Sequence, residues 1–233
     1  MHSLGLAYHR RAMGSASVTG IAEDALCRWF FLDLAARPLL EELRVSSGSR
    51  VLFSSPTTSA FPDARGPGDI DVLIADPQYP EASLAIEVKR VKIQAATFHT
   101  GMPGKLQDLQ RGVQQANLLA DLGFHRTFLV VAVVVDGRER EQLNFASRGP
   151  TFDLVEAIDN FPGRARLAPH VGLAFVEIVQ PVDKPITDAG GIGVRVVRHS
   201  TAVQQPLSVT AAITRLLNAR QGHGEASQET PHN

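Results

Sequence analysis

The most constraining feature of this sequence is an uninterrupted apolar run of eight residues, 128–135. A membrane-spanning helix needs about 20 consecutive apolar residues, so the run is too short to cross a bilayer. It predicts instead a buried strand over residues 127–135. Apolar residues make up 44% of the 233 residues, which is enough to build a sizeable core around such a strand. The sequence therefore predicts one large globular domain and no membrane partner.

Residue patterns on both sides of this strand predict alternating helices and strands. Before it we expect a helix over 19–43 that Pro38 breaks or restarts, strands over 49–54, 69–75 and 83–91, and a helix over 105–122. After it we expect a helix over 152–160, strands over 172–179 and 193–198, and a helix over 208–220. The order helix, three strands, helix, strand is typical of an α/β sandwich in which helices flank one central mixed sheet.

The predicted elements divide the chain into four parts. Residues 1–18 form an N-terminal segment, and residues 19–150 form the core. Residues 151–220 follow without a linker-like stretch, so we expect a C-terminal α/β extension of the same sheet and not a second domain. The polar residues 221–233 predict a disordered tail.

The charge balance excludes a strongly basic protein. Twenty-three Lys and Arg residues against 24 Asp and Glu residues give a formal net charge of −1. No general positive field attracts nucleic acid or membranes, and any site for a polyanion must be local. Cys27 is the only cysteine, and no Cys/His cluster has structural-zinc spacing, which favours a reducing compartment. The first residues lack the apolar stretch of a secretory signal, so the expected location is cytoplasmic.

Two neighbouring predicted strands carry charged residues at alternating positions. Asp69 and Asp71 share one face of the first strand, and Glu87 and Lys89 share one face of the second, because side chains alternate along a strand. The short connection, 76–82, favours a hairpin that sets these polar faces side by side. Carboxylates this close repel one another unless a cation lies among them, and hard oxygen ligands suit Mg²⁺ or Mn²⁺. A solvated hairpin with cross-strand ion pairs is the alternative interpretation of the same pattern.

Asp71, followed sixteen residues later by Glu87-Val88-Lys89, resembles the active-site motif of the PD-(D/E)XK nuclease superfamily. The order of predicted elements over 19–136 is similar to the core of that superfamily, which implies the restriction-endonuclease-like fold. By this resemblance, Asp71 and Glu87 are metal ligands, the main-chain carbonyl of Val88 is a further ligand, and Lys89 is the catalytic lysine.

The resemblance implies two more site residues and leaves one choice open. Many members place a glutamate on the first helix that reaches the same metal, and Glu23 matches that position. Some members add a glutamine on the helix after the lysine strand, where Gln114 is favoured among four candidates. These candidates are Gln107, Gln110, Gln114 and Gln115. The residue before the aspartate is Ile70 where the motif has proline, so Asp69 is a rival to Asp71, which is favoured because it lies deeper in its strand.

The function that the resemblance implies is a metal-dependent nuclease that hydrolyses phosphodiester bonds, with Mg²⁺ as cofactor and Mn²⁺ as a substitute. DNA is the favoured partner and an endonuclease the favoured activity, and a homodimer is a further expectation because members often act as dimers. Basic residues near the motif can form a local patch for a phosphate backbone. They are Arg65, Lys89, Arg90, Lys92, Lys105 and Arg111.

Two other functions compete with the nuclease hypothesis. One is a non-catalytic module that keeps the nuclease-like fold and binds nucleic acid or protein within a larger complex. The other is a self-assembling structural protein. Binding of divalent metal that depends on Glu87 would separate the enzyme from the module, and light scattering would detect self-assembly.

Overall fold

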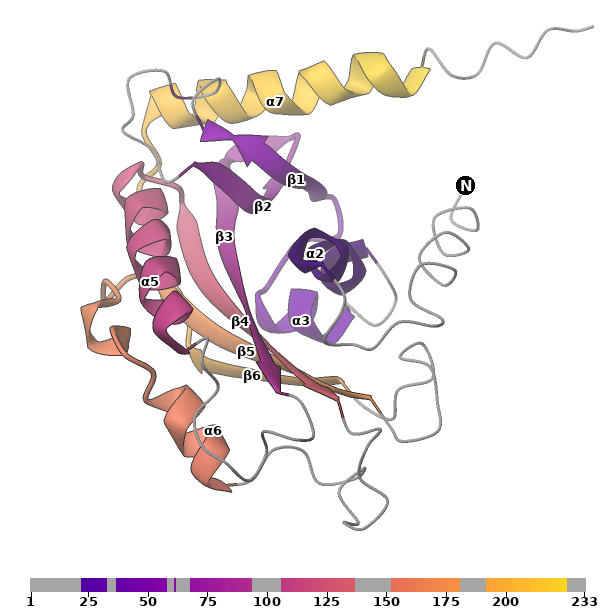
Figure 1. Ribbon diagram of the computed structural model, residues 1–233. Helices are drawn as coiled ribbons and strands as arrows, with labels where there is room; N and C mark the ends of the chain where they lie inside the picture. Colours follow the sequence, from indigo (N-terminus) through magenta and orange to yellow (C-terminus); the bar gives the residue numbers. More distant parts are fainter. Residues whose placement is uncertain are drawn as a thin grey trace, which may run out of the picture.

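The computed structural model describes residues 22–32, 37–57, 61, 68–93, 106–136, 152–180 and 192–225. Its centre is a six-stranded mixed sheet in the order β1-β2-β3-β4-β5-β6, with helices packed against it (Figure 1). The prediction of an α/β fold with helices flanking a mixed sheet is therefore confirmed. In the part of the chain that the structure describes, none of the helices has the length and apolar character that crossing a bilayer requires.

The strands pair in both directions. They are β1 (Arg50–Pro56), β2 (Asp69–Asp76), β3 (Tyr79–Ile93), β4 (Arg126–Asp136), β5 (Gly172–Gln180) and β6 (Ile192–Arg198). The pairs β1–β2 and β2–β3 are antiparallel, the strands β3, β4 and β5 are mutually parallel, and β6 is antiparallel to β5. The region predicted to extend the core thus adds β5 and β6 to the same sheet.

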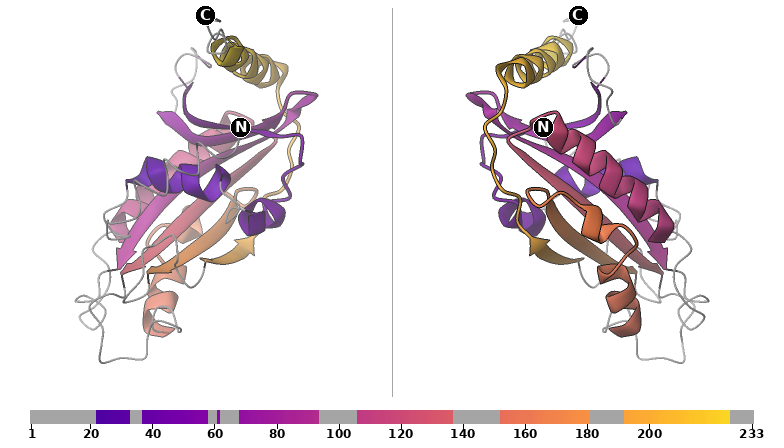
Figure 2. Two further views of the ribbon diagram at one scale, coloured as in Figure 1. Left: turned by 90° about the vertical axis from the view of Figure 1, so that its right-hand side faces the viewer. Right: turned by 90° about the vertical axis from the view of Figure 1, so that its left-hand side faces the viewer.

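The helices lie on both faces of this sheet. They are α2 (Glu23–Leu32), α3 (Arg37–Glu42), α5 (Leu106–Asp121), α6 (Phe152–Asp159), the short 3₁₀ helix η4 (Arg164–Arg166) and α7 (Leu207–Glu225). Figure 2 shows α2 and α3 on one face in its left view and α5 and α6 on the other face in its right view. The helix α7 lies across the end of the sheet that carries β1 and β2 (Figure 1).

The restart expected at Pro38 within 19–43 is present: α2 ends at Leu32 and α3 begins at Arg37, so that Pro38 is the second residue of α3, where the first turn needs no N–H from it. Another predicted helix boundary was wrong. The helix α7 continues to Glu225, so residues 221–225 are not part of a disordered tail. Gly222 and Gly224 are poor helix formers, so propensity alone does not predict this extension, but once a helix has formed each added residue gains a hydrogen bond. Residues 1–18 and 226–233 lie outside the described residues.

Alternation along β3 and β4 builds two separate cores. Ile86 and Val88 point to the α2 face, where they pack with residues of α2 and α3 such as Phe30 and Leu39. Val91 and Ile93 point to the opposite face, together with residues of α5 and α6. Both faces of these central strands are covered, as expected for buried parallel strands. Residues 83–88, in the middle of β3, are therefore enclosed by protein on both faces.

The strands β2 and β3 separate part-way along their length, and this separation positions the site. They pair as a hairpin from Asp76↔Tyr79 to Val72↔Ile86. The strand β3 then continues to Ile93 and stays paired with β4 as far as Ile93↔Val135. Beyond Ile86, the edge of β3 that faces β2 has no paired strand among the described residues. Its main-chain N–H and C=O groups there need other partners.

Candidate functional site

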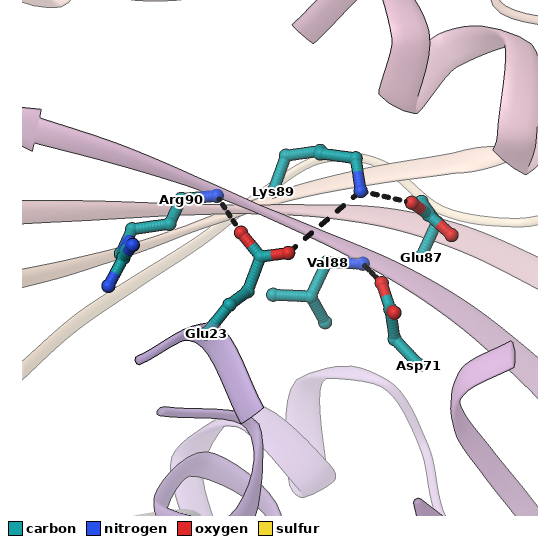
Figure 3. A network of polar contacts seen from close by, with 6 residues as sticks. All are labelled: Glu23, Asp71, Glu87, Val88, Lys89 and Arg90. Atoms are coloured by element: carbon teal, nitrogen blue, oxygen red, sulfur yellow. Dashed lines mark hydrogen bonds and ion pairs between the residues drawn. The ribbon is translucent and has the colours of Figure 1, made fainter. Parts of the chain in front are cut away.

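Two carboxylates occupy the opening between β2 and β3. The main-chain N–H of Val88 donates to Oδ2 of Asp71 at 2.8 Å, and the N–H of Arg90 donates to Oε2 of Glu23 at 3.1 Å (Figure 3). The two side chains thus take the place of a neighbouring strand. Because the N–H and C=O of one strand residue point to the same edge, the carbonyl of Val88 faces this opening as well.

Glu87 and Lys89 lie on the α5 face of β3, and their polar ends also reach the site. Glu87 is completely buried, and one of its carboxylate oxygens forms an ion pair with Nζ of Lys89. The same Nζ lies 4.0 Å from Oε1 of Glu23 (Figure 3). Three elements, α2, β2 and β3, therefore bring together the four residues that the sequence motif singled out. These are Glu23, Asp71, Glu87 and Lys89.

The environment favours a proton on Glu87. Burial and the nearby carboxylate of Asp71 raise the pKa of Glu87, Lys89 opposes both effects, and the net result is a rise from an ordinary value of 4.5 to about 8. Burial likewise raises the pKa of Asp71, although the N–H of Val88 and the charge of Lys89 lower it. The site therefore concentrates more negative charge than its surroundings stabilise.

Lys89 remains a cation at neutral pH. Burial lowers the pKa of Lys89, but the carboxylate of Glu87 and its hydrogen bond raise the pKa by more, so the net shift is upward. A lysine held in this way supplies a fixed positive charge and does not act as a proton acceptor near pH 7.

The oxygen atoms at the site fit a hard divalent cation. The candidate ligands are the carboxylates of Asp71 and Glu87 and the carbonyl of Val88, and Oε2 of Glu87 has no hydrogen-bond partner among the described residues. In the described part of the chain, no three Asp, Glu, His or Cys side chains form one metal-binding group. Asp71 and Glu87 supply two carboxylates, and Mg²⁺ in proteins is typically held by one or two carboxylates together with waters and substrate phosphate.

The structure distinguishes Asp71 from its rival Asp69. Asp69 is exposed at the first position of β2, where it pairs with Pro56. Asp71 is largely enclosed, and its carboxylate contacts the main chain of β3 at Val88. Asp71 is therefore the aspartate that shares a site with Glu87.

Gln114, the glutamine favoured from the sequence, points away from the site. Gly112 is the residue of α5 that faces Lys89, and each helical residue turns the chain by about 100°. Gln114 is therefore about 200° from Gly112 around the axis, and its side chain is exposed. Gln115 lies on the same side of α5 as Gly112 and is half-buried, so Gln115 and not Gln114 is on the side of the helix that faces Lys89. Spacing between glutamines alone does not reveal which side of the helix meets the sheet.

The predicted basic patch is only partly described. Lys89, Arg90 and Lys92 follow one another along β3 and are half-buried, while Arg111 is exposed on α5. Arg65 and Lys105 lie outside the described residues. Three of the predicted basic residues thus lie on β3, the strand that carries Glu87.

Gly112 is a residue of the site that sequence analysis missed. A Cβ atom at this position would lie 2.5 Å from Cγ of Lys89 and 3.3 Å from Cδ1 of Leu129. Only glycine lets α5 approach β3 closely enough to bury the stem of Lys89. The available signal was a glycine inside an otherwise regular amphipathic helix, which often marks a close approach.

We expect Gly112→Ala to destabilise the protein by about 1–2 kcal/mol because the added methyl group overpacks Lys89. In an unconstrained helix the same change would add about 1 kcal/mol of stability, so the sign of the effect is diagnostic. Urea unfolding of Gly112→Ala and of Gln114→Ala measures it, and the second variant should change stability little. A stability gain for Gly112→Ala would contradict the close packing of α5 on Lys89.

No protein-family model, no curated protein and no solved structure matches this chain. The likeness to the PD-(D/E)XK superfamily thus rests on the motif and on the order of elements. The α/β class with a six-stranded mixed sheet is an observation, whereas the restriction-endonuclease-like fold and its activity belong to the proposal that follows.

Proposed function

We propose that this protein is a metal-dependent nuclease of restriction-endonuclease-like fold that hydrolyses phosphodiester bonds in DNA as an endonuclease. One observation carries the proposal. Three carboxylates and a lysine, drawn from α2, β2 and β3, meet where β2 leaves β3. Glu87 is completely buried and Asp71 is half-buried, and raised pKa values of buried carboxyl groups such as these concentrate at functional sites.

Each residue has a role in this proposal. Asp71, Glu87 and the carbonyl of Val88 would hold Mg²⁺, or Mn²⁺ in its place. When bound, the ion supplies a Lewis acid for a phosphoryl oxygen and lowers the pKa of a coordinated water. Lys89 donates to the attacking water or to the phosphate and stabilises the negative charge that develops there. Glu23 holds the main chain at Arg90 and stands close to Lys89, so it positions the lysine.

The decisive experiment is cleavage of supercoiled plasmid DNA. We expect the protein to produce nicked and linear DNA in Mg²⁺ or Mn²⁺ and no product in EDTA. Lys89→Met should lower the rate by about a hundredfold or more, because one positioned donor to the transition state is worth about that much. Lys92→Met is the matched control, since it removes the same charge from the other face of β3, and it should change the rate only a few-fold.

Two outcomes of this assay would count against the proposal. Equal cleavage by wild type and by folded Lys89→Met would exclude the hydrolytic role of this site. Cleavage of an RNA substrate without cleavage of plasmid DNA would replace DNA by RNA as the substrate. Nicked and linear products, as opposed to gradual shortening of linear DNA, distinguish an endonuclease from an exonuclease.

A non-catalytic nuclease-fold module is the second candidate, and one observation favours it. Each carboxylate of the site already contacts a protein donor, namely the N–H groups of Val88 and Arg90 or the ammonium of Lys89. Titration calorimetry with Mg²⁺ and Mn²⁺ separates the candidates. The enzyme requires metal binding that Glu87→Gln removes, whereas the module requires no metal binding that depends on Glu87.

A further inference from the structure

A second concave site lies at the other end of the sheet from the carboxylate cluster. It is a pocket of about 560 Å³ beside η4 and the strands β5 and β6. Small-molecule sites commonly have volumes of about 300–1,000 Å³. Its lining residues are Asn160, Phe161, Gly163, Arg164, Ala165, Leu167, Leu173, Val197 and Arg198. The strands β3 and β4 separate this pocket from the opening beside β2.

Two guanidinium groups give the described lining of this pocket a positive charge. Arg164 and Arg198 both line it, and among the described residues no acidic side chain does. Burial lowers the pKa of Arg198, and the charge of Arg164 lowers it further, so the two cations act on each other. Asp159, whose main-chain carbonyl accepts from Arg164, has its carboxylate engaged elsewhere, because its two oxygens accept from Arg195 at 2.6 and 3.1 Å.

Main-chain carbonyl groups hold both guanidinium groups in place. In Arg198, Nε donates to the carbonyl of Val171 at 2.8 Å and Nη2 donates to the carbonyl of Ala168 at 2.9 Å. Nη1 of Arg164 donates to the carbonyl of Asp159. Among the described residues, Nη1 of Arg198 and both Nε and Nη2 of Arg164 have no hydrogen-bond acceptor. These donors are fixed before any ligand arrives, which reduces the entropy lost on binding.

The remaining walls of the pocket are largely apolar. Phe161, Leu167 and Leu173 belong to the core on the α5 face, and Val197 packs against that core. An ion such as inorganic phosphate fills only a small part of the volume and contacts none of this surface well. Two cations favour a dianion over a monovalent carboxylate. A ligand that satisfies both features carries a phosphate dianion on a flat apolar body.

We propose that this pocket binds a small phosphomonoester with an aromatic or apolar body, the chemical class to which aryl phosphates and nucleoside monophosphates belong. Its phosphate contacts Arg164 and Arg198, and its body lies against Phe161 and Leu173. The pocket is separate from the carboxylate cluster, so the proposed ligand binding does not depend on the proposed nuclease activity.

Titration calorimetry of the full-length protein with phenyl phosphate tests this site. We expect one binding event with a Kd of about 1 mM or lower, which is typical of a ligand of this size. Inorganic phosphate has the dianion without the apolar body, and phenol has the apolar body without the dianion. Each should bind at least about tenfold more weakly than phenyl phosphate. Benzoate should also bind more weakly, because it offers a single negative charge.

Two variants locate the binding. Arg164→Gln should raise the Kd for phenyl phosphate by about tenfold or more, since it removes a charged hydrogen-bond donor. Arg166→Gln is the matched control: it removes an exposed arginine of the same η4 that does not line the pocket, and it should leave the Kd unchanged. Ala165→Trp fills the pocket from an exposed position and should abolish binding without disturbing the core.

Three results would overturn the proposal. These are the absence of any binding of phenyl phosphate up to about ten times the expected Kd, equal affinity for phenyl phosphate and inorganic phosphate, and unchanged affinity in both Arg164→Gln and Ala165→Trp. Thermal unfolding of each variant confirms that the comparison is made on folded protein. If a variant loses phenyl phosphate binding but still binds divalent metal at the carboxylate cluster, the two sites are independent of each other.

Discussion

Asp71→Asn is expected to lower plasmid cleavage by at least about a thousandfold. Asparagine keeps the size of the side chain but removes the charge that would hold a divalent cation beside Glu87. A bound metal ion is worth several kcal/mol of transition-state stabilisation, and each 1.4 kcal/mol corresponds to a factor of ten in rate. The measurement is the initial rate of plasmid nicking in Mg²⁺ under single-turnover conditions.

Asp69→Asn is the matched control for this prediction. It makes the same chemical change two residues earlier on β2, at an exposed position. We expect Asp69→Asn to retain activity within a few-fold of wild type. The reverse order, with Asp69→Asn inactive and Asp71→Asn active, would show that the other aspartate serves as the ligand. Equal loss of cleavage activity in both variants would indicate that the total negative charge of β2, and not the position of Asp71, controls the rate.

The second large effect is a loss of stability as the pH rises. The pKa of Glu87 is 4.5 as an ordinary value and about 8 in the folded protein. Between these two pH values the unfolded chain has released its proton while the folded chain still holds it. The folded state therefore binds more protons, and the free energy of unfolding falls as pH increases, by about 1 kcal/mol per pH unit for one group. Urea denaturation at several pH values from 5.5 to 8 measures this slope.

Glu87→Gln provides the control for the pH effect. Glutamine keeps the shape of the side chain and does not titrate, so the slope should become markedly flatter in the variant. Lys89 contributes little to the slope, because its pKa is raised and it stays protonated throughout this range. Mg²⁺ should also flatten the slope in wild type if it binds ionised Glu87. A slope that is equal in wild type and Glu87→Gln would contradict the buried, proton-favouring environment of Glu87.

Local sequence patterns were sufficient for the parts of this protein that depend on short-range periodicity. The apolar run identified β4, and the alternation in Glu87-Val88-Lys89 placed the two charged residues on one face of β3. The short connection after Asp76 predicted the β2–β3 hairpin. Each of these features depends on residues close together in the chain, where the two-residue period of a strand leaves few alternatives.

Other features could not be predicted because they depend on how distant elements pack. Gln114 was favoured over Gln115 from the spacing of the glutamines alone. That spacing does not say which side of α5 meets the sheet. The close approach of Gly112 to Lys89 is set by the distance between a helix and a strand that lie far apart in the chain. The extension of α7 to Glu225 likewise depends on a helix already anchored by Val209 and Ile213.

The sequence by itself determined that Asp71, Glu87 and Lys89 lie on neighbouring strands of an α/β protein, because strand alternation and a short hairpin are local properties. Only the tertiary structure decided that these residues form one site. The site exists because β2 pairs with β3 only from Val72 onward while β4 keeps β3 extended beyond Ile86, so that the N–H groups of Val88 and Arg90 donate to the carboxylates of Asp71 and Glu23. Where two strands separate depends on the packing of the whole sheet, and that packing also encloses Glu87 and shifts its pKa.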